Sequence, residues 1–378
     1  MTSTHGNKDQ RILIKECCSL VKAGYDVCQV AQGDSGEYNG VRLIGTGETN
    51  KSAFYRLFIR PRIVYKLALE QNADIYQIHD MELLPYGLKL KRKGKKVIFD
   101  YHEDFASRFA DSDVFHLPKF LMKLLGRLYC SYEKKTISKL DAMISVTPHI
   151  CERLKKYNSR TIMITNYPIT SDNNLWSSPC TYNADSDYIC FAGQVSSVQY
   201  GLDVAIEAIQ DLDIKFKIYG AERRVNDINC LKKLDIFERT VFCGSIPYDK
   251  LPFEISNSRI AIVTPAYTKD TNEREGTLGS NKLFEAMLRG VPVVFTNYNI
   301  WMSINDKYKF GLGVEYGNKK EIREAIKFLL DNIELAKTLG ENGRKAVLGQ
   351  YNWKTQEENL LQLYKEIEGA INENIGSV

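Results

Sequence analysis

The chain has 378 residues, of which 44% are hydrophobic and 26% are charged, and this size is typical of two α/β domains rather than one. It contains no run of about 18 uncharged apolar residues, so we expect no membrane-spanning helix. Its first residues lack the apolar core of a secretory signal, and its nine cysteines form no CxxC pair. We therefore expect a reducing, cytoplasmic location and no disulfide framework.

The positive charge of the chain is concentrated in its first half. Residues 1–170 carry 27 basic and 18 acidic residues, whereas the remainder carries 24 and 29. Residues 89–96 and 119–127 hold much of the excess, and the second segment mixes basic with bulky apolar residues, as an interfacial helix does. Each segment alone is typical of a solvated face or of a core-facing helix. Together they suggest peripheral contact with an anionic membrane, on its inner face, and no nucleic-acid-binding module accompanies them.

Short apolar, β-branched runs alternate with helical patterns along the whole chain, which predicts βαβ units and parallel sheets. The runs predicted as strands in the first half are 25–31, 74–78, 96–101, 142–146 and 161–165. A stretch rich in Ser, Asn, Asp and Pro, 170–187, predicts a linker. The strands predicted after it are 188–192, 215–219, 240–243, 260–264 and 292–295. The pattern predicts two Rossmann-like domains, each with a ligand edge at the carboxyl ends of its strands.

The start of the chain departs from this pattern. A helical pattern opens near Lys8, and a doubly wound fold requires a central strand before such a helix. Only residues 1–4 are available to form it, fewer than the usual 5–6. Two explanations stay open. Either the natural chain begins upstream of Met1, or the sheet tolerates a clipped first strand, in which case the helix packs on a gap.

Residues 275–294 are the segment richest in chemical information. A Gly/Ser/Thr loop opens a helix there, and an apolar strand follows the helix. We expect free backbone N–H groups at the helix N-terminus, at Leu278, Gly279 and Ser280. Such N–H groups attract a diphosphate. Lys282 adds a positive charge in the first turn, and Glu285 lies one turn further, within reach of a ribose diol. The residues alone fit a plain βαβ helix with a serine cap equally well.

This segment resembles the signature of glycosyltransferase family 4, whose helix reads roughly Asn-Lys-Leu-Phe-Glu and is followed by Gly-x-Pro-Val. Three further elements are similar to that family: His79-Asp80 after a strand, Asp100-x-His102-Glu103 at a turn, and Asn166-x-Pro168 before the second domain. The resemblance implies the α/β GT-B fold, in which two Rossmann-like parallel-sheet domains face a central cleft. It also implies retaining transfer of a sugar from a nucleotide-sugar to an acceptor hydroxyl.

The resemblance implies three parts of the chain. These are an N-terminal acceptor domain (1–168) with an apparently clipped first strand, a nucleotide-sugar-binding domain (169–350), and a C-terminal helix (351–378) that packs back towards the first domain. The expected partners are a UDP- or GDP-linked sugar and a saccharide or lipid-linked acceptor, which fits cell-surface polysaccharide or glycolipid synthesis. We expect no cofactor and no metal, because this family neutralises the diphosphate with helix dipoles and cations. A metal held by His and carboxylates is the weaker alternative.

Site residues are carried over from the resemblance position by position. The expected catalytic residues are His102, Glu103, Lys282 and Thr277. The expected donor-binding residues are Gly193, Gln194, Leu278, Gly279, Ser280, Asn281, Lys282 and Glu285. The residues expected on the acceptor side are His5, His79 and Asp80.

The sequence also departs from the family at three positions. Thr277 stands where the family has the first glutamate of a Glu-x7-Glu signature, and Gln194 and Tyr200 stand where it has Arg and Lys. The carboxylates near enough in sequence to replace the glutamate are Glu273 and Glu275. The cations left for the diphosphate are Lys282, Arg274 and Arg223.

These departures keep two alternatives open. The first is an NDP-sugar epimerase, which uses a similar two-domain cleft and needs no acceptor. The second is a degenerate, non-catalytic transferase that acts as a partner subunit, and such a protein need bind no nucleotide.

Overall fold

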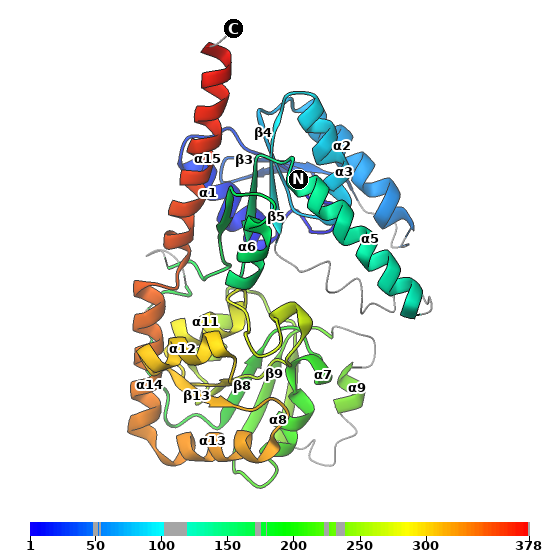
Figure 1. Cartoon of the computed structure of the whole chain (residues 1–378). Helices are drawn as coiled ribbons and strands as arrows, with labels where there is room; N and C mark the ends of the chain where they lie inside the picture. The colour runs from blue at the N-terminus through cyan, green and yellow to red at the C-terminus, as the bar shows by residue number, and fades with distance from the viewer. Residues whose placement is uncertain are drawn as a thin grey trace. The chain divides into compact units, whose positions relative to one another are not determined.

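The computed structural model divides the chain into two compact α/β units (Figure 1). Unit 1 comprises Met1–Asn166 and Thr355–Val378, and unit 2 comprises Tyr167–Lys354. The residues that the structure describes are 1–47, 52, 54–101, 119–170, 175–178, 180–222, 227–231 and 239–376. Among these residues, no helix combines the length and hydropathy needed to cross a membrane.

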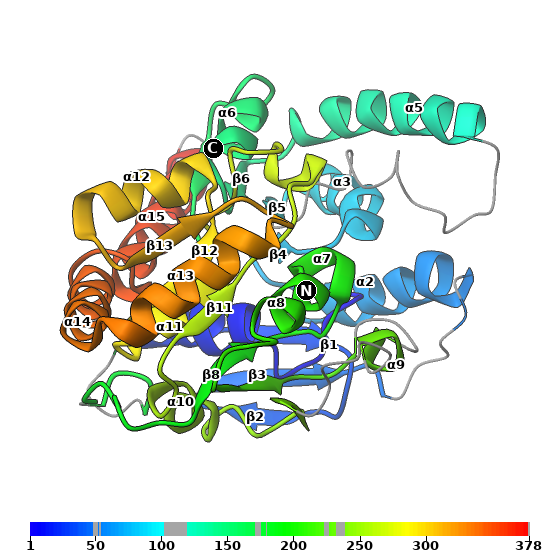
Figure 2. The ribbon, with the colours of Figure 1, turned by 90° about the horizontal axis from the view of Figure 1, so that it is seen from below.

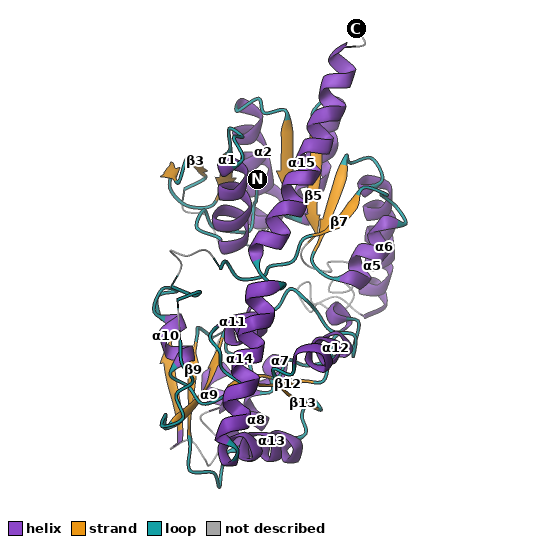
Figure 3. Cartoon of the chain, turned by 90° about the vertical axis from the view of Figure 1, so that its left-hand side faces the viewer, coloured by secondary structure: helices purple, strands orange, loops and turns teal. Residues whose placement is uncertain are grey.

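Unit 2 is built on one six-stranded sheet with the strand order β10-β9-β8-β11-β12-β13. Figure 3 draws strands of this sheet in orange, β9, β12 and β13 among them, with helices around them. The pairings of the sheet are all parallel. The strands are β8 (Tyr188–Ala192), β9 (Lys215–Tyr219), β10 (Thr240–Gly244), β11 (Ala261–Val263), β12 (Val293–Thr296) and β13 (Gly311–Val314). This is a doubly wound order that reverses direction between β8 and β11, and ligands bind outside the carboxyl ends of strands at such a point.

Helices cover both faces of this sheet, because successive side chains of each strand point to opposite sides. Ile189 and Phe191 of β8 belong to the apolar core that the helices after β8 and β13 share, whereas Cys190 adjoins Ala286 on the other face. The helices of the unit are α7 (Ser197–Tyr200), α8 (Leu202–Ala208), α9 (Asp227–Leu231), α10 (Leu251–Ser256), α11 (Asn281–Leu288), α12 (Asn299–Tyr308), α13 (Lys319–Asp331) and α14 (Ile333–Gly349). Burial on both faces explains why the strands read as continuous apolar runs.

Unit 1 has its strands in two sheets. The four parallel strands of the first are β4 (Ile75–Ile78), β5 (Lys96–Tyr101), β6 (Ala142–Ser145) and β7 (Thr161–Met163). The second sheet has the order β1-β3-β2, with strands β1 (Cys28–Ala31), β2 (Gly36–Tyr38) and β3 (Val41–Gly45), which lie side by side in Figure 2. β1 pairs with β3 in parallel, as strands of a Rossmann-like sheet do.

The helices of unit 1 include one from the far end of the chain. They are a helical segment Gln10–Cys17 that continues as α1 (Cys18–Lys22), a turn Tyr55–Ile59 that continues as α2 (Arg60–Glu70), α3 (Leu84–Arg92), α5 (Lys119–Ile137), α6 (Pro148–Lys155) and α15 (Trp353–Gly376). Tyr364 of α15 donates a hydrogen bond to the Gln77 side chain of β4 at 2.9 Å. The ring of Tyr364 also lies 5.6 Å from that of Tyr25.

The predicted strands 96–101, 188–192 and 215–219 coincide with β5, β8 and β9, and the other predicted strands differ from the observed ones at their ends. Strands β2, β3 and β13 were not predicted. β2 and β3 form an antiparallel hairpin whose turn is Asn39-Gly40, with φ of 47° and 82°, and this dipeptide is a strong hairpin signal. β13 contains two glycines, and a Cβ on Gly311 would lie 2.0 Å from the Val293 carbonyl oxygen.

Candidate active site

The loop before α11 forms the first part of the candidate site in unit 2. α11 begins at Asn281 after a cap at Ser280, so the amides of Leu278 and Gly279 precede the helix. The Gly279 N–H donates to the Thr277 hydroxyl at 3.0 Å. The expectation of three free N–H groups is therefore wrong for Gly279, because the threonine side chain accepts its hydrogen bond. The Thr277 carbonyl in turn accepts from the indole of Trp301 at 2.6 Å, which holds the loop against α12.

Lys282 lies over the end of β8. Gly193 follows that strand with φ of +155°, and a Cβ there would lie 1.9 Å from the Lys282 Cε. Only glycine allows the lysine to lie so close. The Lys282 ammonium lies 4.2 Å from the centroid of the Tyr200 ring, in cation–π contact. Gln194 is exposed beside Gly193, so three of the residues predicted from the sequence, Gly193, Gln194 and Lys282, lie at the point where the strand order reverses.

Glu285 lies one turn along α11 from Lys282, and both line a small cavity of about 10 Å³ beside β8 and β11. The Glu285 side chain is buried and accepts a hydrogen bond of 2.7 Å from the Tyr248 hydroxyl. Burial and the carboxylate together raise the pKa of Tyr248 above its usual value, so this tyrosine stays a hydrogen-bond donor. The Tyr248 ring packs on Trp176 of the linker, with centroids 4.9 Å apart.

Two arginines donate hydrogen bonds to backbone carbonyl oxygens of the linker beside this site. Arg289 donates through Nη1 to the carbonyl oxygens of Leu175 (3.0 Å) and Trp176 (2.8 Å). Arg344 donates through Nη2 to the Ser177 carbonyl at 2.7 Å. The guanidinium of an arginine offers five donors in a fixed plane, which suits a turn of several carbonyl groups. Trp176, and through it Tyr248, is thereby held in place near Glu285.

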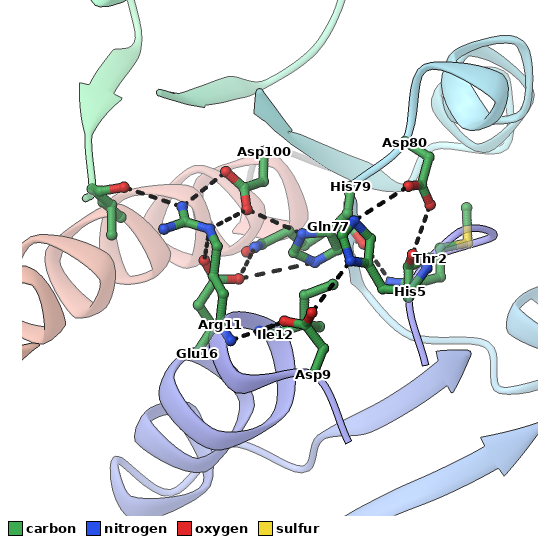
Figure 4. Close-up of polar contacts among 12 residues, drawn as sticks. Thr2, His5, Asp9, Arg11, Ile12, Glu16, Gln77, His79, Asp80 and Asp100 are labelled. Atoms are coloured by element: carbon green, nitrogen blue, oxygen red, sulfur yellow. Dashed lines mark hydrogen bonds and ion pairs between the residues drawn. The ribbon is translucent and has the colours of Figure 1, made fainter. Parts of the chain in front are cut away.

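In unit 1, His79 and Asp80 follow the end of β4, and both are 2% exposed (Figure 4). Asp80 accepts hydrogen bonds from the Thr2 hydroxyl at 2.7 Å and from the Ser3 N–H at 2.5 Å. The Nε2 of His5 lies 3.8 Å from the Asp80 carboxylate. The structure thus brings together the three residues expected on the acceptor side, and it buries two of them.

An ion-pair network lies beside His79 (Figure 4). Arg11 donates two hydrogen bonds of 2.9 Å to Asp100 and lies 3.1 Å from Glu16, while His79 Nδ1 lies 3.1 Å from Asp100. Burial opposes the charge of Arg11, yet the carboxylates of Asp100 and Glu16 hold its pKa above the usual value. Burial raises the pKa of Glu16 to about 8, although Arg11 opposes this shift.

Glu16, His79 and Asp100 each offer a ligand atom within 4.8 Å of the others, a spacing that a metal ion could bridge. The cationic guanidinium of Arg11 already pairs with Asp100 at 2.9 Å and lies 3.1 Å from Glu16. The donor set is therefore that of a buried ion pair with a histidine, and it gives no reason to place a metal here.

Several predicted residues contribute no geometry to the site. His102, Glu103 and Arg223 lie outside the described residues. Arg274 is exposed, pairs with Glu315 and packs on the ring of Tyr267 at 4.7 Å.

The nearby alternative acids differ in their surroundings. Glu275 accepts a hydrogen bond of 3.3 Å from the Asn299 side chain, and Glu273 is exposed. Asn281, expected to bind the donor, is half-buried, and its side-chain oxygen is buried with no hydrogen bond.

The contacts of Arg11, Glu16, Asp100 and Tyr248 were not predicted from the sequence. A signal existed for Asp100, because it is an acidic residue inside a strand that otherwise reads as buried. For Tyr248 there was none, because it lies between β10 and α10 in a loop whose path is set by tertiary packing.

Two family models match the chain, one for each unit. Residues 11–166 match Glycosyltransferase Family 4, and residues 176–346 match Glycosyl transferases group 1. Two uncharacterized glycosyltransferases of Methanocaldococcus jannaschii are 25% and 26% identical, over 64% and 47% of this chain. The matches span 63% and 45% of those relatives, less than two thirds of either.

Solved structures share the fold over nearly the whole chain. Sucrose-phosphate synthase from Thermosynechococcus elongatus has a TM-score of 0.74 at 17% identity, covering 96% of this chain and 94% of that one. The Anabaena protein HepE in complex with UDP and glucose has a TM-score of 0.70 at 13% identity, with coverage of 96% and 98%. WaaG, a glycosyltransferase involved in lipopolysaccharide biosynthesis, has a TM-score of 0.67 at 14% identity, with coverage of 95% and 96%.

The expected α/β GT-B fold is confirmed by these neighbours and by the parallel sheets of both units. Because the two family models together extend from residue 11 to residue 346 with one short gap, the chain belongs to the glycosyltransferases of group 1 and family 4.

Proposed function

We propose that the chain transfers a sugar from a nucleotide-sugar to an acceptor hydroxyl with retention of anomeric configuration. One observation carries the proposal: Lys282 and Glu285 lie one turn apart on α11, beside Gly193 at the reversal point of the sheet. A nucleoside diphosphate presents the matching chemistry, since its diphosphate is anionic and its ribose offers two hydroxyl donors. Glu285 would accept from the ribose, and Lys282 would neutralise the diphosphate.

The diphosphate would be held by one cation and by backbone dipoles. Lys282 lies in the first turn of α11, where the N–H groups of the helix also attract anions. Tyr200 stands at the position of a family lysine, and its ring holds the Lys282 ammonium at 4.2 Å. Gly193 lets a phosphate approach the backbone, and Gln194, Asn281 and Ser280 are the polar neighbours proposed to complete the donor site.

In the proposed mechanism, the acceptor hydroxyl attacks the anomeric carbon from the face that the nucleotide leaves. The bond between that carbon and the phosphate oxygen breaks, and the leaving phosphate accepts the proton of the hydroxyl. The protein contributes orientation and stabilises the charge of the leaving group. This route needs no carboxylate nucleophile, which suits a site with Thr277 in place of glutamate. His102 and Glu103 remain proposed as contacts to the donor sugar.

We place the acceptor on unit 1 and propose that it is carried by a membrane lipid. α5 exposes Leu124 (51%) and Leu128 (60%) together with the basic side chain of Arg127. Exposed leucines with interspersed basic residues on one helix are typical of an interfacial helix on anionic lipid. His79 and Asp80 are the proposed acceptor-side residues of the same unit, and the role of WaaG in lipopolysaccharide biosynthesis supports the proposal.

A thermal-shift screen of UDP-, GDP- and ADP-linked sugars tests the donor site. A ligand at 100 times its Kd stabilises the folded state by about 2.7 kcal/mol, so a donor should raise the melting temperature measurably. We expect nucleotide-sugars of one base to raise it, and inorganic pyrophosphate to raise it less because pyrophosphate has no ribose for Glu285. A screen in which no nucleotide changes the melting temperature would contradict the proposal and favour a non-catalytic subunit.

A further inference from the structure

The segment that opens α2 exposes a cluster of large apolar side chains on unit 1. Phe54 is 66% exposed, Phe58 is 61% exposed and Ile59 is 40% exposed. The rings of Phe54 and Phe58 pack on each other, with centroids 5.2 Å apart. Single exposed apolar residues are ordinary on a protein surface, whereas a contiguous group marks a surface that meets an apolar partner. We call Phe54, Phe58 and Ile59 the α2 tip.

The backbone presents the α2 tip away from the core and holds it there. Tyr55–Ile59 form a π-helical turn that continues into α2, and no residue of this turn is buried. Such turns are rare and often lie at functional sites. Arg60 fixes the base of the tip, because it is buried, lies 5.7 Å from the centroid of the Tyr55 ring and donates to the Ser3 carbonyl at 3.0 Å.

Cations surround the α2 tip, and no carboxylate balances them. Segment 54–69 contains four basic residues and no acidic one. Arg56, Arg62 and Lys66 are exposed, and none of the three forms an ion pair with a residue that the structure describes. Arg62 and Lys66 follow Phe58 at intervals of four residues, so the positive charge continues along the helix face that begins at the ring. Apolar side chains with adjoining cations match the layered chemistry of an anionic bilayer.

The surroundings of the α2 tip favour a broad partner that reaches the acceptor side. α3 contacts both α2 and α5, and α2 and α5 begin on the same side of unit 1 in Figures 1 and 2. The exposed leucines of α5 therefore offer a second apolar contact to a wide surface. Ser3, which accepts from Arg60, donates through its N–H to Asp80 at 2.5 Å. The tip is thus joined by two hydrogen bonds to a proposed acceptor-side residue.

We propose that the α2 tip inserts into the apolar layer of an anionic bilayer, while Arg56, Arg62 and Lys66 bind the lipid headgroups. Aromatic rings are favoured at the boundary between headgroups and acyl chains, and exposed cations beside them extend towards the phosphates. The inference rests on the proposed function, because it names the surface by which unit 1 reaches a lipid-linked acceptor. It adds a point of insertion on an element other than α5.

A tryptophan at the tip measures insertion directly. The three native tryptophans are buried, so their emission changes little when vesicles are added. We expect the emission of Phe58→Trp to shift to shorter wavelength on phosphatidylglycerol vesicles and to be quenched by brominated acyl chains. Phe253→Trp is the matched control, since Phe253 is 51% exposed on α10 of unit 2. Absence of the shift and of quenching in Phe58→Trp, or an equal response of the control, would overturn the inference.

Co-sedimentation tests the rings and the cations separately in the full chain. Phe54→Ser with Phe58→Ser should lower the partition coefficient on phosphatidylglycerol vesicles by about tenfold or more, because two apolar side chains no longer leave water. Arg56→Gln with Arg62→Gln should remove most of the preference for phosphatidylglycerol over phosphatidylcholine. Wild-type partitioning of the serine variant would overturn the inference. So would a wild-type chain that forms a dimer which the serine variant abolishes and that binds no vesicle, since a second copy would then cover the tip.

Nucleotide binding separates this inference from the proposed function. The serine variant should keep the wild-type thermal shift with the nucleotide-sugar found by the screen, because the tip and the donor site lie on different units. Insertion of the tip in a chain that binds no nucleotide would contradict the proposed function and support the docking surface. A chain that binds the nucleotide-sugar without insertion of the tip would overturn the docking surface alone.

Discussion

At the scale of single residues, the candidate donor site depends on two side chains of α11. Lys282 lies over Gly193 and is held by the Tyr200 ring, while Glu285 is buried and bound by Tyr248. The two positions differ in what they can do. A lysine beside the diphosphate acts on charge that grows as the nucleotide leaves, whereas a buried carboxylate acts on a ribose that does not change during the reaction. Mutations should therefore separate turnover from binding.

Lys282→Ala should lower kcat more than it weakens donor binding, because the leaving phosphate gains charge in the transition state. Loss of one preorganised donor at such a centre costs on the order of 10²–10³ in rate. Steady-state kinetics together with calorimetry of the free nucleotide measure both quantities. Lys320→Ala is the matched control, since Lys320 is a well exposed lysine of the same unit. An unchanged kcat with only a raised KM would contradict the assignment of Lys282.

Glu285→Ala should weaken the binding of the free nucleotide, because the ribose loses its acceptor. Tyr248→Phe keeps the ring on Trp176 and removes only the hydroxyl that holds Glu285 at 2.7 Å, so we expect a smaller loss of about 1 kcal/mol, or roughly fivefold in Kd. Isothermal titration calorimetry with the nucleotide found by the screen compares the two variants. Wild-type affinity in Glu285→Ala would rule out the ribose role, and wild-type affinity in Tyr248→Phe alone would rule out the positioning role of the tyrosine.

The buried carboxylate of Glu16 predicts a dependence of stability on pH. Burial raises its pKa from 4.5 to about 8, so between these values the folded state binds more protons than the unfolded state. Stability from this group is therefore present below about pH 4.5 and is lost as the pH rises towards 8. Glu16→Gln should flatten this decline in urea unfolding followed from pH 5 to 8. A decline of the same slope in the variant would show that another group causes it.

At the scale of elements, α5 distinguishes a membrane-bound acceptor from a dissolved one. The helix exposes Leu124 and Leu128, with exposed basic residues at Arg127 and Lys134. These residues lie in a part of unit 1 that the sequence shows to be basic as a whole. The same pattern in a helix that packs on a core would bury the leucines, so their exposure is the informative observation.

A double variant, Leu124→Ser with Leu128→Ser, should reduce binding to vesicles of anionic lipid, because it removes the apolar side chains that would enter the interface. Co-sedimentation with phosphatidylglycerol vesicles and with phosphatidylcholine vesicles measures the loss and its dependence on charge. Leu348→Ser is the matched control, since Leu348 is 43% exposed on α14 of unit 2. Equal binding of the double variant and the control would contradict a role for α5 at a membrane.

The elements also show where sequence patterns sufficed. β5, β8 and β9 were predicted at both ends, because each is a β-branched or aromatic run buried in a parallel sheet. β13 was not predicted, because its two glycines lack the β-branched or aromatic side chains that are typical of strands. β2 and β3 were not predicted either, although Asn39-Gly40 is typical of the hairpin turn that joins them.

For the site, the helix pattern placed Lys282 and Glu285 on one helix, where the structure has them. Their partners Tyr200 and Tyr248 come from distant positions, and no local pattern predicts such contacts. Asp100 pairs with Arg11 across 89 positions of the chain for the same reason.

At the scale of the whole molecule, the chain passes between the two units twice, after Asn166 and after Lys354. Near each of these two points, a hydrogen bond within one unit holds the chain in place. In unit 2 the Trp353 N–H donates to the Pro168 carbonyl at 2.8 Å, and in unit 1 the Thr165 N–H donates to the Gln356 side chain at 2.9 Å. Donor and acceptor sites are proposed on different units, so the proposed function requires a reaction that uses both.

An NMR time course of the wild-type chain, with the nucleotide-sugar identified by the screen and a membrane extract as acceptor, measures such a reaction. We expect release of the nucleoside diphosphate and transfer of the sugar in a linkage of the same anomeric configuration as in the donor. Conversion of the donor into an epimer in the absence of an acceptor would contradict it, and so would a linkage of inverted configuration.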